Sequence, residues 1–109
     1  MIRVCVRQKK DFILKVQFFG HADYDVYGSD IVCAAVSSTY FCSVNACYLF
    51  HEESILVESS HGVQTILVMD DDANVQKILI NMIHCLENLE KKYPRNIKID
   101  KEEEECLSF

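Results

Sequence analysis

Several features that define large classes of proteins are absent from this sequence of 109 residues. Its longest unbroken apolar run, Ile31 to Val36, is far shorter than the ~20 residues that a membrane-spanning helix needs, so we expect no membrane contact. The first residues also lack the basic start, apolar block and small-residue cleavage site of a secretory signal. We therefore expect a soluble, cytoplasmic protein.

The six cysteines form no CxxC pair, and their spacing matches no zinc pattern. A single domain of this length buries roughly two-thirds of its unfolded surface and does not need disulfide bonds for stability. We therefore expect reduced thiols, no disulfide framework, no metal and no other cofactor.

Acidic residues outnumber basic ones by 17 to 11, which gives a formal net charge of −6. Much of the excess lies in two runs, Asp70 to Asp72 and Glu102 to Glu105. Such a surface repels phosphate backbones, so direct binding of nucleic acid is disfavoured, whereas a basic protein could bind it.

Apolar patterns predict strands in two places: alternation in the first, and runs rich in branched apolar residues beside a turn sequence in the second. At the start of the chain, Gln8 to Asp11 separates two alternating series and predicts a β-hairpin; the apolar members are Ile2, Val4 and Val6, then Phe12, Leu14, Val16 and Phe18 on one face. A second hairpin is predicted from Ile55 to Glu58 and from Val63 to Met69, with Gly62 supplying a positive φ in the turn.

Two long helices are predicted. The segment from Ile31 to about Phe50 is apolar on most sides and contains no Gly or Pro, which indicates a largely buried helix with Ser29 or Asp30 as its N-cap. After Asp70 to Asp72, which offers caps, apolar residues keep three-and-four spacing for five turns up to Pro94: Val75, Ile78, Leu79, Met82, Ile83, Leu86, Leu89 and Tyr93.

A candidate fifth strand covers Asn96 to Asp100, and an acidic tail occupies about 101–109. The resulting order, ββαββα(β), predicts one α+β domain over residues 1–109. We expect a two-layer sandwich in which two long helices cover mainly one face of a mixed or antiparallel sheet.

The candidate chemistry lies between the first predicted hairpin and the first predicted helix. His21 follows a strand and Cys33 begins a helix, so a fold that joins the ends of the intervening loop, Ala22 to Ser29, would bring imidazole and thiol together. A thiol attacks a carbonyl only as thiolate. With Asp30 as N-cap, Cys33 would be the third helical residue, where unpaired amides favour negative charge and could hold an oxyanion.

Each of these residues also has a simpler interpretation. A cysteine in the run IVCAAV is, by composition alone, more often a small core residue than a nucleophile. Asp30 could orient His21, although capping is the commoner role.

The loop itself carries two glycines and two tyrosines. Gly20 and Gly28 bracket it and would suit a lid that moves over a bound peptide. Tyr24 and Tyr27 could pack against apolar substrate side chains or simply anchor the loop.

Gly20-His21-Ala22, Gly28 and the run Asp30 to Ser37 resemble the signature of the ribosomal-processing cysteine proteases. This bacterial family trims an N-terminal extension from the large-subunit ribosomal protein L27. The length, the two hairpins and the long second helix are similar across nearly the whole chain. The resemblance implies that Cys33 is the nucleophile and His21 its general base, with Asp30 and Ser37 in supporting roles.

The same resemblance implies a homodimer, and a substrate with aromatic residues before the cleavage point, which would suit Tyr24 and Tyr27. Two other functions are compatible with parts of the sequence. A non-catalytic ribosome-assembly factor could bind a basic ribosomal protein through its acidic surface. A redox sensor ranks last, because Cys42 would lie more than two turns from Cys33 along one helix.

The remaining cysteines and histidines give weaker signals. Cys47 and His51 would share a helix face, but two ligands do not make a stable metal site, so a buried thiol beside a helix-end histidine is favoured. Cys5 and Cys42 are predicted to be packing residues, and His61 is predicted at the surface of a turn.

Overall fold

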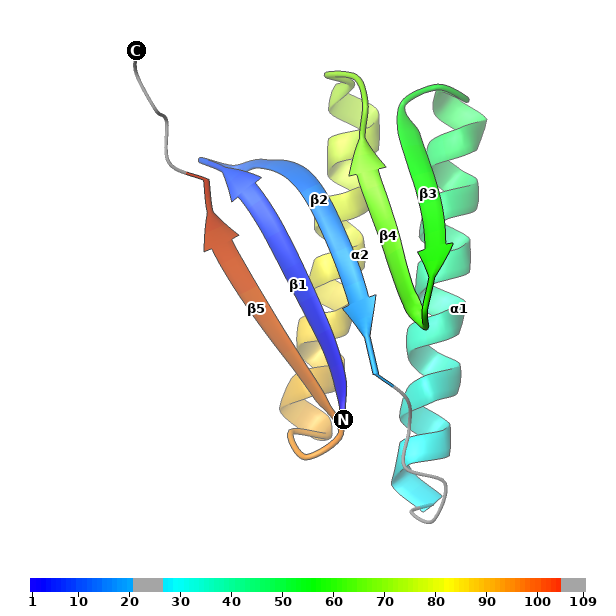
Figure 1. Ribbon diagram of the computed structural model, residues 1–109, viewed down its shortest axis with the longest axis vertical. Helices are drawn as coiled ribbons and strands as arrows, with labels where there is room; N and C mark the ends of the chain where they lie inside the picture. The colour runs from blue at the N-terminus through cyan, green and yellow to red at the C-terminus, as the bar shows by residue number, and fades with distance from the viewer. Residues whose placement is uncertain (21–26, 105–109) are drawn as a thin grey trace.

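The computed structural model describes residues 1–20 and 27–104, and of residues 27–30 only the backbone. Five strands and two helices follow one another in this part of the chain (Figure 1): β1 (Ile2–Lys9), β2 (Phe12–Phe19), α1 (Tyr27–Phe50), β3 (Ile55–Ser60), β4 (Val63–Val68), α2 (Ala73–Lys92) and β5 (Ile97–Glu103). The predicted order of elements is confirmed, including the fifth strand.

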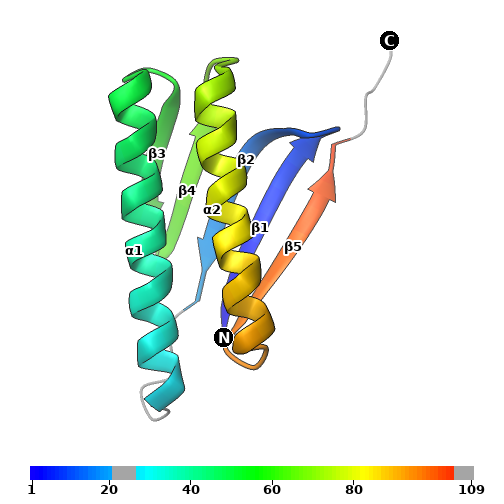
Figure 2. The same cartoon turned by 180° about the vertical axis from the view of Figure 1, so that it is seen from behind.

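The strands form one mixed sheet in the order β3-β4-β2-β1-β5. Neighbouring strands are antiparallel, except that β5 lies parallel to β1. Both helices pack on the same face of the sheet (Figure 2). The predicted α+β two-layer sandwich is therefore confirmed.

The second hairpin has the predicted turn. His61 and Gly62 are the two residues between β3 and β4, and both have positive φ, 51° and 79°. Two consecutive positive φ values define the turn whose twist best matches that of paired strands. His61 is exposed, as predicted.

The first hairpin contains an irregularity that the alternating pattern did not reveal. Arg7 pairs with Lys15 but Gln8 pairs with Ile13, so Leu14 is an extra residue, a β-bulge. The bulge shifts the pleat by one position. Ile13 is buried and Leu14 is only partly so, and the prediction that Leu14 shares the core face with Val16 was wrong.

Helix α1 begins at Tyr27, four residues before the predicted start. Ser29 and Asp30 thus lie inside the helix, and the prediction that one of them is the N-cap was wrong. Only the first four N–H groups of a helix are unpaired. Cys33 is the seventh helical residue. The unpaired N–H groups at the helix start therefore do not lie beside this thiol, and the expectation that they hold the oxyanion has no support.

The prediction of a largely buried α1 was also wrong. One face is buried in the core, but Phe41, Leu49 and Phe50 are 61%, 87% and 60% exposed. By length and composition, Ile31–Phe50 could cross a membrane, with a mean hydropathy of 1.3. A single such helix is weak evidence, since helices that pack on a sheet pass the same test.

Helix α2 matches its prediction closely. Asp72 is the N-cap and accepts hydrogen bonds from the N–H groups of Asn74 and Val75, at 2.9 and 3.0 Å. The helix ends at Lys92, just before Pro94. Strand β5 runs to Glu103, three residues beyond its predicted end, because Lys101 to Glu103 continue the pairing with β1.

Candidate functional site

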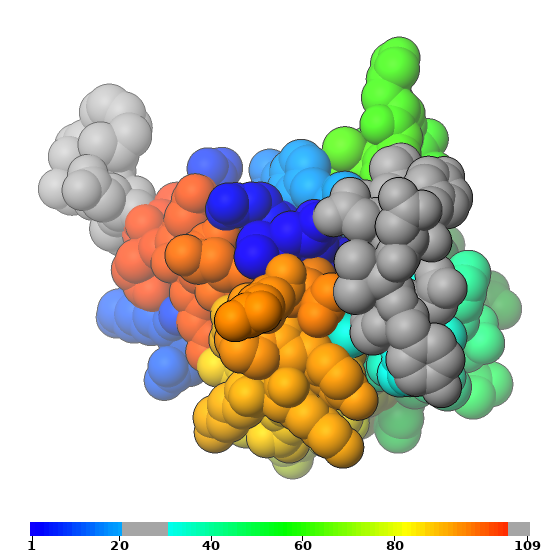
Figure 3. All heavy atoms as spheres, turned by 90° about the horizontal axis from the view of Figure 1, so that it is seen from below, coloured from blue at the N-terminus to red at the C-terminus, as the bar shows by residue number. Residues whose placement is uncertain are grey.

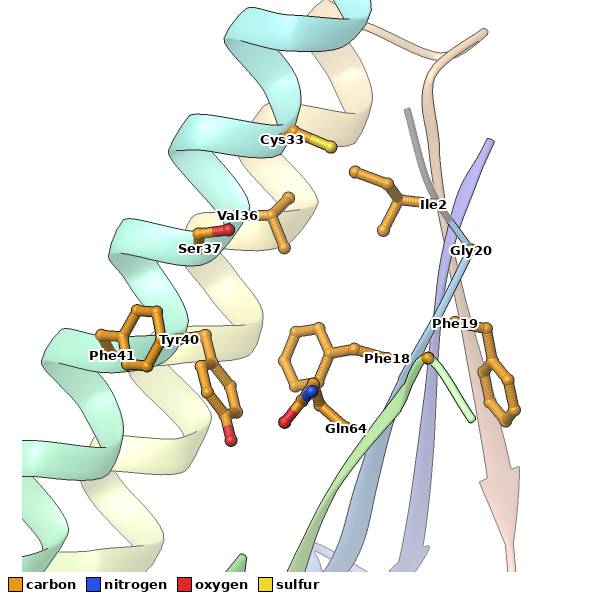
Figure 4. A pocket seen from close by; sticks show the side chains of 11 residues that line it. Ile2, Phe18, Phe19, Gly20, Cys33, Val36, Ser37, Tyr40, Phe41 and Gln64 are labelled. Carbon is orange, nitrogen blue, oxygen red and sulfur yellow. The ribbon is translucent and has the colours of Figure 1, made fainter. Parts of the chain in front are cut away.

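Cys33 lies on α1 at the border between core and solvent. Its neighbours Val32 and Val36 are buried, whereas Cys33 is only partly buried and forms no disulfide. Its sulfur points from the helix toward Ile2 at the start of β1 (Figure 4). The thiol thus packs against the edge of the core and still faces open space.

That space is a cavity of about 240 Å³ between α1 and one end of the sheet. The start of β1 and the end of β2 lie side by side at this end of the molecule (Figure 3). The walls come from all the surrounding elements, among them Ile2, Phe18, Gly20, Cys33, Tyr40 and Gln64.

The cavity is mainly aromatic and apolar. The ring of Tyr40 meets those of Phe18 and Phe41 edge to face, each with centroids 5.2 Å apart. Burial raises the pKa of the Tyr40 hydroxyl, with a smaller contribution from Tyr48, so the hydroxyl stays protonated at neutral pH. Gln64 is fixed by a 2.7 Å hydrogen bond that its amide donates to Ser59. An apolar cavity with a few fixed polar groups is typical of a ligand site.

Two predicted site residues share this cavity with Cys33. Ser37 follows one helical turn after Cys33 and lines the same wall. Gly20, the residue directly before His21, lines the opposite side. Residues 20, 33 and 37 of the predicted signature are therefore brought together.

The other predicted site residues have different outcomes. Tyr27, Gly28 and Asp30 belong to the first turns of α1, so Gly28 does not lie in the loop as expected. His21 and Tyr24 lie outside the described residues, and the pairing of His21 with Cys33 stays a prediction.

Tyr40 and Gln64 are among the cavity residues that the sequence did not predict. Tyr40 follows Ser37 by three residues and Cys33 by seven, which is the spacing of one helix face. This spacing is a sequence signal that could have identified Tyr40. Gln64 carried no signal, because its contact with the cavity depends on the register of β4 beside β2.

The other thiols of the described chain are poorer candidates. Cys47 is fully buried, and burial raises its pKa to about 11, with Asp72 adding to the effect. His51 instead pairs with Asp70, at 2.9 Å between Nε2 and Oδ2. The preference for a buried thiol over a metal pair agrees with this geometry.

Cys5 and Cys42 differ in their surroundings. Cys5 is partly buried, and burial, followed by the charges of Asp100 and Glu102, raises its pKa. Cys42 is exposed, so its prediction as a packing residue was wrong. Within residues 1–20 and 27–104, no three His, Cys, Asp or Glu side chains are grouped to hold a metal ion.

A free thiol at the rim of an apolar cavity, on a small α+β fold, is compatible with a hydrolase that uses a cysteine nucleophile. Residues 1–98 match the family described as cysteine protease Prp. The chain belongs to this family and is a cysteine protease. The non-catalytic alternative considered from the acidic composition is therefore not supported.

Relatives with the same description occur in two well-characterised bacteria. The ribosomal processing cysteine protease Prp of Staphylococcus aureus is 36% identical over 86 residues, which cover 74% of this chain and 79% of that protein. The Bacillus subtilis protein of the same name is 30% identical over 107 residues, covering 91% and 96%.

Solved structures agree. A crystal structure of an essential ribosomal processing protease Prp from S. aureus, in complex with a substrate peptide, has a TM-score of 0.85 and 31% identity. Another, with a covalently linked product peptide, has a TM-score of 0.84 and 32% identity. Each alignment covers 94% of this chain and 100% of the other. The family, the fold and the enzyme class predicted from the sequence are thus confirmed.

Proposed function

We propose that this protein is a cytoplasmic endopeptidase that removes the N-terminal extension of ribosomal protein L27, with Cys33 as nucleophile and His21 as general base. The observation that carries the proposal is the Cys33 thiol, which faces a cavity whose opposite wall includes Gly20, the residue before His21. The names of the relatives, which describe ribosomal processing, support a ribosomal substrate, and the resemblance of the Gly20 to Ser37 signature suggests L27.

The reaction follows from the chemistry of the two groups. His21 takes the proton of Cys33, and the thiolate attacks the scissile carbonyl carbon. The protonated imidazole then gives its proton to the leaving amine, and a thioester joins the peptide to Cys33. Water, deprotonated by His21, attacks the thioester, releases the new carboxyl terminus and restores the thiol.

The cavity suits an aromatic side chain next to the scissile bond. Its volume of about 240 Å³ exceeds the ~150 Å³ of a protein cavity that binds benzene. The edge-to-face walls of Phe18 and Tyr40 add a preference for a third ring. We propose that an aromatic residue of the substrate binds here; the suggested contacts of Tyr24 and Tyr27 stay predictions.

The test is cleavage of a synthetic peptide that spans the extension junction of L27. Wild-type protein should release the two expected fragments, and Cys33→Ala should release none. Cys85→Ala, which changes an exposed thiol on α2, is the matched control and should cleave at the wild-type rate. Cleavage that persists in Cys33→Ala would rule out the assignment.

We further propose a homodimer formed through α1. Six exposed residues of this helix repeat with alternating spacings of three and four: Ile31, Ala34, Ser38, Phe41, Asn45 and Tyr48. This is the spacing of a helix-pairing seam, in which small residues permit close approach and large ones fill the contact. Between Ile31 and Phe50 the helix has no charged residue, so two copies of an acidic chain can meet here without repulsion.

Light scattering after gel filtration tests the dimer. Phe41→Glu places a charge in the middle of the seam and should yield monomers. Leu56→Glu changes an exposed apolar residue of β3 that follows the buried Ile55 and so lies on the sheet face opposite the helices; this variant should stay dimeric. A dimer of unchanged affinity in Phe41→Glu would exclude this interface.

A further inference from the structure

Gly20 occupies the point at which the chain leaves β2 and leads into His21. Its φ is +89°, a left-handed conformation that side-chain-bearing L-residues rarely adopt. The residue before it, Phe19, is still paired with Arg3 of β1. The backbone therefore leaves the strand conformation at Gly20 itself.

Space, as well as conformation, requires glycine here. A Cβ of L configuration at position 20 would lie 2.4 Å from the carbonyl oxygen of Met1 and 3.4 Å from its carbonyl carbon. Both are backbone atoms, so no side-chain rotation can relieve the contact.

The Met1 carbonyl that this Cβ would meet is itself held in place. Its carbonyl belongs to the same planar peptide group as the N–H of Ile2, which donates a 2.9 Å hydrogen bond to the carbonyl of Asn96. Ile2 is 5% exposed and pairs with Ile97 of β5. Turning the Met1 carbonyl away would break this bond, so a side chain at position 20 must move the β2 end instead.

The direction of that end matters because Gly20 and Ile2 border the cavity that Cys33 faces. Figure 4 shows Gly20 and Ile2 on the sheet side and the Cys33 sulfur pointing toward them from α1. We propose that Gly20 is a positioning residue: its left-handed backbone, packed against the Met1 carbonyl, sets the direction in which the chain continues to the catalytic base. This inference rests on the proposed role of His21.

The sharpest test compares the two mirror-image alanines at position 20. Gly20→Ala introduces the clash and an unfavourable φ. Gly20→D-Ala prefers positive φ and carries its methyl group at the other Cα position, not at the L position that would meet the Met1 carbonyl. The D-variant can be made by ligating a synthetic peptide of residues 1–41 to residues 42–109, since Cys42 provides the junction.

For Gly20→Ala, we expect kcat for the junction peptide to fall about 10- to 100-fold, because small misplacements of a catalytic group have effects of this size. KM should change less than about twofold, and alkylation of Cys33 near pH 7 should slow in parallel with kcat. Gly20→D-Ala should keep kcat within about threefold of the wild type. Ile83→Val, a core change on α2, controls for lost stability and should keep the wild-type kcat.

Two results would overturn the proposal: a wild-type kcat in Gly20→Ala, or equal losses in the L- and D-alanine variants. Cys33→Ala separates this failure from that of the proposed function. If it is inactive while Gly20→Ala is fully active, only the positioning role falls. If Cys33→Ala still cleaves, both fall.

Discussion

At the scale of single residues, burial separates the thiols that the sequence could not rank. Cys33 and Cys47 lie on the same helix, each among apolar neighbours, and composition alone treats them alike. Cys33 reaches a cavity, whereas Cys47 is fully enclosed by the core. A charged thiolate is costly in apolar surroundings, so of these two thiols only Cys33 has the access that catalysis needs.

The Cys47 thiol should also make the protein's stability depend on alkaline pH. Its pKa is raised to about 11 in the folded state, against ~8.5 for an unperturbed cysteine. Between these values the unfolded chain loses the proton and the folded chain keeps it. The stabilisation is therefore complete below pH ~8.5 and is lost as the pH rises through about 11.

Urea unfolding from pH 8 to 11 measures this effect. The free energy of unfolding of the wild type should fall with pH more steeply than that of Cys47→Ala, by up to about 1.4 kcal/mol per pH unit. Cys85→Ala, an exposed cysteine, should keep the wild-type slope. Identical slopes for the wild type and Cys47→Ala would contradict the prediction.

At the scale of elements, the sequence predicted whatever depends on local periodicity. Helix α2 was predicted correctly because its apolar face, its cap at Asp72 and its stop at Pro94 are all local signals. The start of α1 was not, because Ser29 and Asp30 are good caps but are also tolerated in a first helical turn. The bulge at Leu14 has no local signal at all.

The bulge is held by a contact between distant elements. Gln76 of α2 accepts a hydrogen bond from the N–H of Ile13 and donates one to its carbonyl, both at 2.8 Å. Gln76 is 8% exposed, so water cannot readily replace it. The partners are 63 positions apart in the sequence, so this pairing could not be foreseen from either segment alone.

Gln76→Leu replaces one side chain by another of similar size, but it should still destabilise the fold strongly. It leaves a buried N–H and a buried carbonyl of Ile13 without their partner, at about 1–3 kcal/mol for each such group. We expect a loss of about 2–4 kcal/mol in urea unfolding. Gln17→Leu, whose only bond to Thr65 is long at 3.4 Å, should cost less than about 1 kcal/mol. Equal losses in the two variants would show that the Ile13 bonds contribute little.

At the scale of the whole molecule, the site depends on both ends of the described chain. The cavity is built from β1, β2, α1 and the second hairpin. The start of β1 is in turn held by the loop before β5, because the N–H of Ile2 donates a hydrogen bond to the carbonyl of Asn96. The family signature between Gly20 and Ser37 predicted the chemistry without this support. Its signal is local, whereas the parallel pairing of β1 with β5 joins segments nearly the whole chain apart.

Ile97 offers a test of this coupling, because it is fully buried and pairs with Ile2. Ile97→Ala should lower the free energy of unfolding by about 2–5 kcal/mol and, by loosening the start of β1, should also lower kcat for the junction peptide. Ile66→Ala on β4 is the matched control: it removes an equally buried side chain that does not line the cavity. Both variants should be assayed at a temperature where more than about 95% of each is folded, which circular dichroism can verify. If kcat falls equally in both variants, the loss reflects general destabilisation and β5 does not support the site. If kcat falls only in Ile97→Ala, β5 holds in place the ends of β1 and β2 that border the cavity.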